Sequence, residues 1–171
     1  IMMRGLDASF SGEGLEFKAI QLAMFVGENW IVTRHQSTST SINYMWERLA
    51  SGKDLPLTGA GIAVGIANRL ARRYVEMLLE FEPRLEEIEE EMFEKPDDVL
   101  LAELTSHKSR LREIIRIARY HHIVTEQLLE TEKSGGGAYQ HEASSLVEQV
   151  DRTGSLAAMY YDTSKDLTDS Y

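Results

Sequence analysis

Apolar residues recur every three or four positions along the middle of the chain. The stripe comprises Ile62, Ile66, Leu70, Tyr74, Leu78, Phe81, Leu85, Ile88 and Met92. This spacing predicts an amphipathic helix of about eight turns, because residues three and four apart share one helical face. Thr58 precedes the stripe and is suited to cap the helix N-terminus. Pro83 is expected to kink or divide the helix, because proline lacks the N–H that the helical ladder needs.

Two further helical patterns follow this stripe. Lys-Pro-Asp-Asp at residues 95–98 indicates a stop, a turn and a new N-cap, so a second helix is expected over residues 97–132. Three glycines at residues 135–137 end it, and a third helix is expected over residues 142–171. Its apolar stripe is interrupted by small and hydroxyl residues. A half-polar helix of about 30 residues is not stable by itself, so we expect it to pack on other helices or on other copies of the chain.

The first 57 residues have the shorter pattern of β-structure. Apolar runs at residues 1–3 and 17–25, a Gly-Glu-Asn turn at 27–29 and a β-branched run at 30–33 predict strands that include a hairpin, and a short helix is expected over 42–50. The predicted fold class is α+β: a partial β-sheet layer with short helices, a long antiparallel helical hairpin, and a long C-terminal helix. The predicted units are residues 1–57, 58–133, a glycine-rich linker at 134–141, and 142–171.

Composition narrows the functional classes. The 171 residues include no cysteine, which excludes disulfides and thiolate metal sites, and the net charge of −10 makes nucleic acid an unexpected partner. No apolar run approaches the roughly 20 residues that span a bilayer. The chain begins at Ile1 and its last helical pattern reaches Tyr171 without a stop signal. We therefore interpret it as the ordered part of a longer protein.

The charges are segregated along the chain. Residues 76–98 hold eleven acidic and two basic residues, residues 105–120 hold one acidic and five basic, and residues 139–171 hold six acidic and two basic. The net charges of these segments are therefore −9, +4 and −4, and their sign alternates from one segment to the next. The alternation predicts helices that pack side by side with complementary faces.

No arrangement typical of an enzyme is present. None of the five histidines is four positions from another, as a helical metal pair requires, and we interpret them as structural or surface residues. Gly59, Gly61 and Gly65 miss the dinucleotide-binding spacing and do not follow a strand. No nucleophile is marked by its neighbours. We therefore expect a protein that is not an enzyme.

Two groups of carboxylates remain as candidate cation sites. The first is an acidic face of the long helix, formed by Glu86, Glu87, Glu89, Glu90, Glu91 and Glu94. Either it is a solvated helix face, or its summed field attracts divalent cations. The second comprises Asp162, Asp166 and Asp169, whose spacing of four and three places them on one side of the last helix. They are either simply exposed or, where such helices meet, they require bridging cations.

These residues carry a family resemblance. Residues 85–96 (LEEIEEEMFEKP) resemble the acidic helix end and turn of CorA-type divalent-cation transporters, and the basic helix after them is similar to the next cytoplasmic helix of that family. Residues 162–171 (DTSKDLTDSY) resemble the end of its stalk helix, before the first membrane span. Residues 3–6 (MRGL) and 30–33 (WIVT) resemble the zinc-transporting ZntB branch as much as CorA itself.

The resemblance implies a function and an assembly. It implies the cytoplasmic, funnel-shaped domain of a homopentameric transporter in the cell (inner) membrane, with Mg²⁺ or another divalent cation (Zn²⁺, Co²⁺ or Ni²⁺) as the regulatory and transported ion. It implies a regulatory metal site in which Asp162 pairs with an acidic residue from the α/β layer of a neighbouring subunit, in an N-terminal part that we expect this chain to lack. The membrane spans and the Gly-Met-Asn pore signature would follow Tyr171. The alternative is a soluble α-helical scaffold or adaptor that oligomerises through its last helix and transports no metal.

Overall fold

The computed structural model describes residues 1–7, 15–52 and 58–170 and has an α+β fold, as predicted. Strands β1 (Met2–Leu6), β2 (Ala19–Val26) and β3 (Ile31–His35) form an antiparallel sheet in the order β1-β2-β3. The predicted hairpin joins β2 to β3, with Val26 opposite Ile31. Alternate residues of β2 (Ile20, Leu22 and Met24) are buried, so one face of the sheet packs on the helices.

Four helices follow the sheet, and three of them are long. They are α1 (Thr40–Ala50), α2 (Gly59–Glu94), α3 (Asp98–Ser134) and α4 (Gln140–Ser170). Both predicted caps are present: the Thr58 hydroxyl accepts from the Gly61 N–H at 3.1 Å, and an Asp97 carboxylate oxygen accepts from the Leu100 N–H at 2.8 Å. Pro83 is exposed within α2 and does not divide it. The expected boundary at residues 57 and 58 adjoins residues 53–57, which lie outside the described part of the chain.

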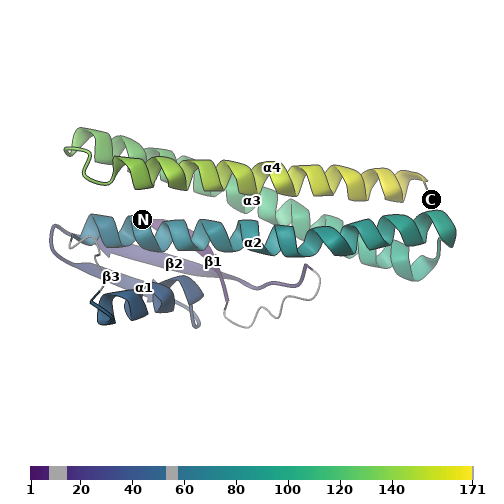
Figure 1. Ribbon diagram of the computed structural model, residues 1–171, viewed down its shortest axis with the longest axis horizontal. Helices are drawn as coiled ribbons and strands as arrows, with labels where there is room; N and C mark the ends of the chain where they lie inside the picture. Colours follow the sequence, from purple (N-terminus) through teal and green to yellow (C-terminus); the bar gives the residue numbers. More distant parts are fainter. Residues whose placement is uncertain (8–14, 53–57, 171) are drawn as a thin grey trace.

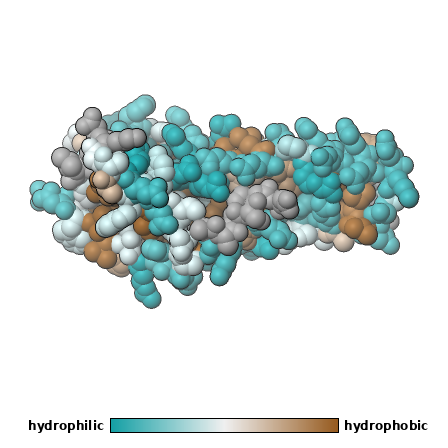
Figure 2. Space-filling view, turned by 60° about the horizontal axis from the view of Figure 1, so that its bottom comes forward, coloured by the Kyte–Doolittle hydropathy of each residue, from teal (hydrophilic) through white to brown (hydrophobic). Residues whose placement is uncertain are grey.

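The long helices form one elongated layer, with the sheet and α1 against the N-terminal half of α2 (Figure 1). α2 and α3 run antiparallel, as expected of the hairpin, but α4 packs along both of them and they contact each other at few positions. The sheet is tied to α2 by Tyr74, whose hydroxyl donates to the carbonyl of Arg4 at 3.0 Å. Figure 2 shows that hydrophilic side chains predominate on the viewed face of the helical end, with separate hydrophobic areas between them.

The charged helices pair only partly as predicted. The ion pair that joins α2 to α3 among the described residues runs from Arg84 of the acidic helix to Glu103 of the basic helix, at 2.8 Å. Two basic residues of α3 contact aromatic side chains: the Arg110 guanidinium lies 5.6 Å from the Phe17 ring centroid, and Arg112 donates to the Tyr161 hydroxyl of α4 at 3.0 Å. The consecutive helices α3 and α4, of opposite net charge, pack side by side as expected, whereas α2 and α3 are largely separated by α4.

Candidate metal-binding site

The three predicted aspartates lie on the exposed side of α4. The buried residues of this helix recur at steps of three and four: Ala143, Leu146, Val150, Thr153, Ala157, Tyr160, Ser164 and Leu167. Asp162, Asp166 and Asp169 each follow a buried residue by two positions, which is about 200° around a helix. All three are exposed. We call this row of carboxylates the aspartate face of α4.

The buried side of α4 fixes the direction of the aspartate face. Its small and hydroxyl residues let the helix approach its neighbours closely; a Cβ added at Gly154 would lie 3.6 Å from the Ala118 Cβ of α3. The Thr153 and Ser164 hydroxyls donate to carbonyls four residues earlier, at 2.9 and 2.8 Å, so they need no partner elsewhere. Rotating α4 would bring aspartates into an apolar contact, which is costly for a charged group.

The aspartate face does not form a complete metal site within one chain. Among residues 1–7, 15–52 and 58–170, no group of three or more His, Asp or Glu side chains is arranged to hold an ion. The carboxylates of the aspartate face are hard oxygen donors, as Mg²⁺ prefers, and Mg²⁺ commonly binds one or two carboxylates and retains its water molecules. The face can therefore supply part of a ligand set, with the rest coming from water or from another molecule.

The predicted acidic face of α2 is partly neutralised by one arginine. Arg84 donates to Glu87 and Glu91 of its own helix at 3.1 Å each, and to both carboxylate oxygens of Glu103 at 2.9 and 2.8 Å. These bonds hold the pKa of the Glu103 carboxyl below its usual value and that of the Arg84 guanidinium above it. Two of the six predicted glutamates are thus held by an internal cation.

The other four glutamates of this face show no ion pair among the described residues. They are Glu86, Glu89, Glu90 and Glu94, of which Glu89 is half-buried and the others are exposed. The burial of the Tyr160 hydroxyl, with the nearby Glu82 and Glu86 carboxylates, raises its pKa to about 12. At Glu86 the acidic face of α2 therefore approaches the buried side of α4, where Tyr160 lies.

The histidines are placed as structural or surface residues. His121 is buried and accepts a hydrogen bond from the Arg4 N–H at 2.9 Å, and burial lowers its pKa to about 4. His107 is also buried, with its ring centroid 4.8 Å from that of Phe81, and its pKa is lowered. The half-buried His122 ring lies 2.7 Å from Asp151 and 3.4 Å from Glu126, but through opposite nitrogens. Those two carboxylates therefore do not converge on one ion.

A cavity near the sheet was not predicted. It has a volume of about 630 Å³, lies between α1, α2 and the start of α4, and is lined in part by Arg48, Arg69 and Arg72. The spacing of three between Arg69 and Arg72 was a signal, because it places both on one helical face. Nothing in the sequence indicated that Arg48 of α1 lies beside them.

No helix in the described part of the chain has the length and apolar character needed to cross a bilayer. The family model described as "CorA-like Mg2+ transporter protein" matches residues 1–171. No curated protein matches the chain.

Solved structures share the fold at low sequence identity. The ZntB cytoplasmic domain from Vibrio parahaemolyticus RIMD 2210633 matches with a TM-score of 0.74 and 17% identity, over 99% of this chain and 66% of that one. The soluble domain of CorA from Methanocaldococcus jannaschii matches with a TM-score of 0.73 and 17% identity, over 99% of this chain and 67% of that one. The complete CorA magnesium transporter from the same organism matches with a TM-score of 0.78 and 15% identity, over 99% of this chain and 53% of that one. The chain thus spans between about half and two thirds of the length of these structures.

Proposed function

The chain belongs to the CorA-like Mg²⁺ transporter family, and we propose that it is the cytoplasmic regulatory part of a divalent-cation transporter in the inner membrane. The family consists of transporters rather than enzymes. The observation that carries the regulatory role is the aspartate face of α4: three carboxylates on the exposed side of a helix whose opposite side is fully packed. The solved CorA structure that matches this chain is that of a magnesium transporter, which supports the same assignment here.

The ligand set of the aspartate face is completed by a second copy of the protein. One α4 presents a row of carboxylates in a single direction, so an ion bound there has open coordination positions. A neighbouring subunit in a homopentamer fills some of them with its own oxygen donors, and water fills the others. Asp162 is the principal ligand in this proposal, and Asp166 and Asp169 extend the negative potential along the helix.

The regulated equilibrium follows from electrostatics. When divalent cations are abundant, they bridge carboxylates of adjacent subunits and favour a closed, symmetric assembly. When they are scarce, the unscreened aspartate faces repel one another and the subunits separate, which favours the open pore. The ion acts through its different affinity for the two states, as any allosteric ligand must.

The regulatory ion is a hard or borderline divalent cation. The aspartate face offers only carboxylate oxygens, which suit Mg²⁺ and also accept Zn²⁺, Co²⁺ and Ni²⁺. Mg²⁺ is the first candidate because of the family to which the chain belongs.

Thermal melts of the full-length protein, with and without millimolar Mg²⁺, test the proposal. We expect Mg²⁺ to raise the melting temperature, because an ion that binds only the folded assembly stabilises it. Asp162→Ala should abolish most of that shift. Glu148→Ala is the matched control, since Glu148 is also an exposed acidic residue of α4 but lies about four turns earlier. A melting temperature that does not respond to Mg²⁺ in the unmodified protein contradicts the proposal.

A further inference from the structure

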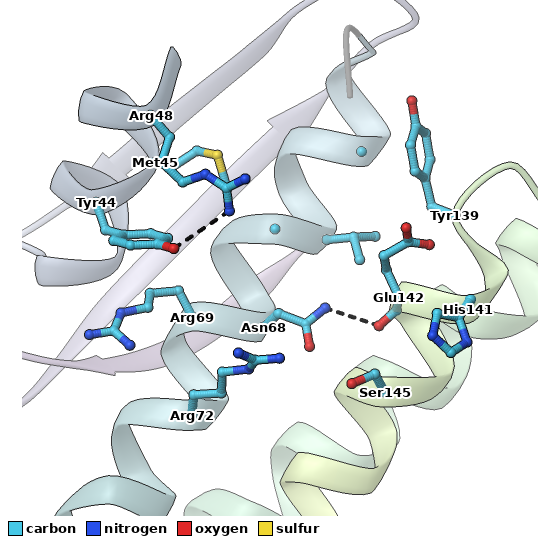
Figure 3. Close-up of a pocket in the computed structure, with 13 residues that line it drawn as sticks. Tyr44, Met45, Arg48, Asn68, Arg69, Arg72, Tyr139, His141, Glu142 and Ser145 are labelled. Carbon is cyan, nitrogen blue, oxygen red and sulfur yellow. Dashed lines mark hydrogen bonds between the residues drawn. The ribbon is translucent and has the colours of Figure 1, made fainter. Parts of the chain in front are cut away.

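The cavity between α1, α2 and α4 is a concentration of positive charge in an acidic protein. The chain has a net charge of −10, yet three of its arginines line this one cavity, which Figure 3 shows with Arg48 from α1 and Arg69 and Arg72 from α2. Among the described residues that line the cavity, one is acidic, Glu142. The cavity therefore has a positive balance, in contrast to the acidic end of the molecule.

Two of the arginines have guanidinium groups available to a ligand. Arg48 makes a long contact of 3.5 Å with the Tyr44 hydroxyl, and neither Arg48 nor Arg72 forms an ion pair with any described residue. Arg69 is bound through one terminal nitrogen to Glu76 at 3.0 Å, but its Nε is buried and has no hydrogen-bond partner. A buried N–H without a partner is uncommon in folded proteins and indicates a missing acceptor.

The cavity also contains an unsatisfied acceptor. The Asn68 Nδ2 donates to the main-chain carbonyl of Glu142 at 2.9 Å (Figure 3), and a carbonyl can only accept, so the orientation of the amide is fixed. Its Oδ1 is then buried without a partner. Two residues that line the cavity therefore carry buried polar atoms without a partner, Arg69 at Nε and Asn68 at Oδ1.

The walls of the cavity are held in place by packing. The Met45 side chain of α1 packs over Gly65 of α2, where an added Cβ would lie 2.4 Å from the Met45 Cε. The Arg48 and Arg69 guanidiniums lie 5.7 and 5.0 Å from the centroid of the Tyr44 ring, which restricts both side chains. Thr58 donates to the Tyr139 hydroxyl at 3.1 Å and joins the start of α4 to the start of α2.

We propose that this cavity binds a phosphate ester whose organic part carries a hydrogen-bond donor, with nucleoside monophosphates as the representative class. Guanidinium groups match phosphate oxygens with paired hydrogen bonds, and the charge of a monophosphate offsets two free arginines. A hydroxyl or amino group of the ester satisfies Asn68. A cavity of about 630 Å³ is in the range that encloses a molecule of this size.

The cavity is separate from the acidic face of α2. Glu86 begins the acidic face 14 positions after Arg72 on α2, about 21 Å along the helix. The inference concerns a site separate from the aspartate face, so it stands or fails independently of metal regulation.

Isothermal titration of the protein with AMP, inorganic phosphate and adenosine tests the proposal. We expect saturable binding of AMP that is tighter than that of phosphate or adenosine. Arg72→Gln should weaken AMP binding about tenfold or more, since a charge-assisted hydrogen bond is lost. Asn68→Leu should weaken AMP but leave phosphate unchanged. Arg119→Gln, an exposed arginine of α3 that does not line the cavity, is the matched control and should bind AMP as the unmodified protein does.

Three outcomes would overturn the inference. They are no AMP binding by the unmodified protein, AMP binding that survives Arg72→Gln, and phosphate binding as tight as that of AMP. The melting temperature of Arg72→Gln provides the folding control, and we expect it to be unchanged because the side chain is exposed.

Discussion

The two halves of α2 share one helical geometry but have different neighbours. The N-terminal half lies between the sheet and α1 on one side and α4 on the other, and it is buried on several faces. The C-terminal half buries a single stripe, Phe81, Leu85, Ile88 and Met92, and is otherwise acidic. The first half anchors the structure, whereas the second half leaves charge exposed to solvent and to cations.

The largest expected effect compares one substitution in both halves. Leu70 is 1% exposed and lies against β1, where its Cδ1 is 3.4 Å from the position of a Cβ at Gly5, whereas Leu85 is 4% exposed in the acidic half. Leu70→Ala should lower the free energy of unfolding by about 4 kcal/mol and Leu85→Ala by about 2 kcal/mol, because a less enclosed site relaxes around the cavity. Urea unfolding of both variants measures the difference. Equal losses would contradict the contrast between the halves.

The next effect concerns how the stability of each half depends on pH. His121 packs against Tyr74 of the N-terminal half, with ring centroids 5.9 Å apart, and its pKa is about 4 in the folded protein. The unfolded chain binds the proton more readily, so stability is complete above pH ~6.5 and falls by up to about 3 kcal/mol as the pH drops to ~4. His107, whose pKa is also lowered, adds to the same slope.

His121→Gln retains an acceptor for the Arg4 N–H but does not titrate, and it should remove most of this slope in urea titrations between pH 4 and 7. His141→Gln, at an exposed position, is the control and should leave the slope unchanged. Glu103 of α3, which pairs with Arg84 of the acidic half, has its effect at lower pH. Because its pKa is lowered, its contribution to stability is present above its usual pKa near 4.5 and is lost on further acidification. A slope that His121→Gln does not change would contradict the assignment.

The smallest of these effects concerns the arginine that orders the acidic half. Arg84→Gln removes hydrogen bonds to Glu87, Glu91 and Glu103 and should cost about 1–2 kcal/mol, because the group is partly exposed but binds one partner through two bonds. Arg84→Lys should retain part of this, since lysine keeps the charge without the planar fork. A double-mutant cycle with Glu103→Gln measures the coupling between the two residues. No coupling would mean that Arg84 does not join α2 to α3.

Local order could be predicted from the sequence because its causes are local. The stripe over residues 62–92, the caps Thr58 and Asp97 and the turn before β3 each depend on neighbours a few positions away, and all are present. The exposure of Asp162, Asp166 and Asp169 follows from the same periodicity, because the residues two positions earlier are buried.

Features that depend on the packing of distant segments could not be predicted in this way. The segment charges predicted that consecutive helices pack side by side, but not that α4 lies against α2 as well as α3. The Arg84–Glu103 pair also has the opposite polarity to the one expected. The arginine cavity is formed where α1 packs on α2 beside the start of α4, and no sequence pattern indicated that arrangement. Whether the aspartate face binds an ion depends on a second molecule and stays a prediction.

Mg²⁺ flux through the full-length transporter in lipid vesicles, measured at increasing Mg²⁺ on the cytoplasmic side, tests the regulatory role of the aspartate face most directly. Inhibition of the unmodified protein should be saturable. Asp162→Asn should need about tenfold more Mg²⁺ for the same inhibition, as expected when roughly 1.4 kcal/mol of binding is lost. Glu148→Gln should be inhibited like the unmodified protein. The same inhibition curve for Asp162→Asn and the unmodified protein would contradict the account.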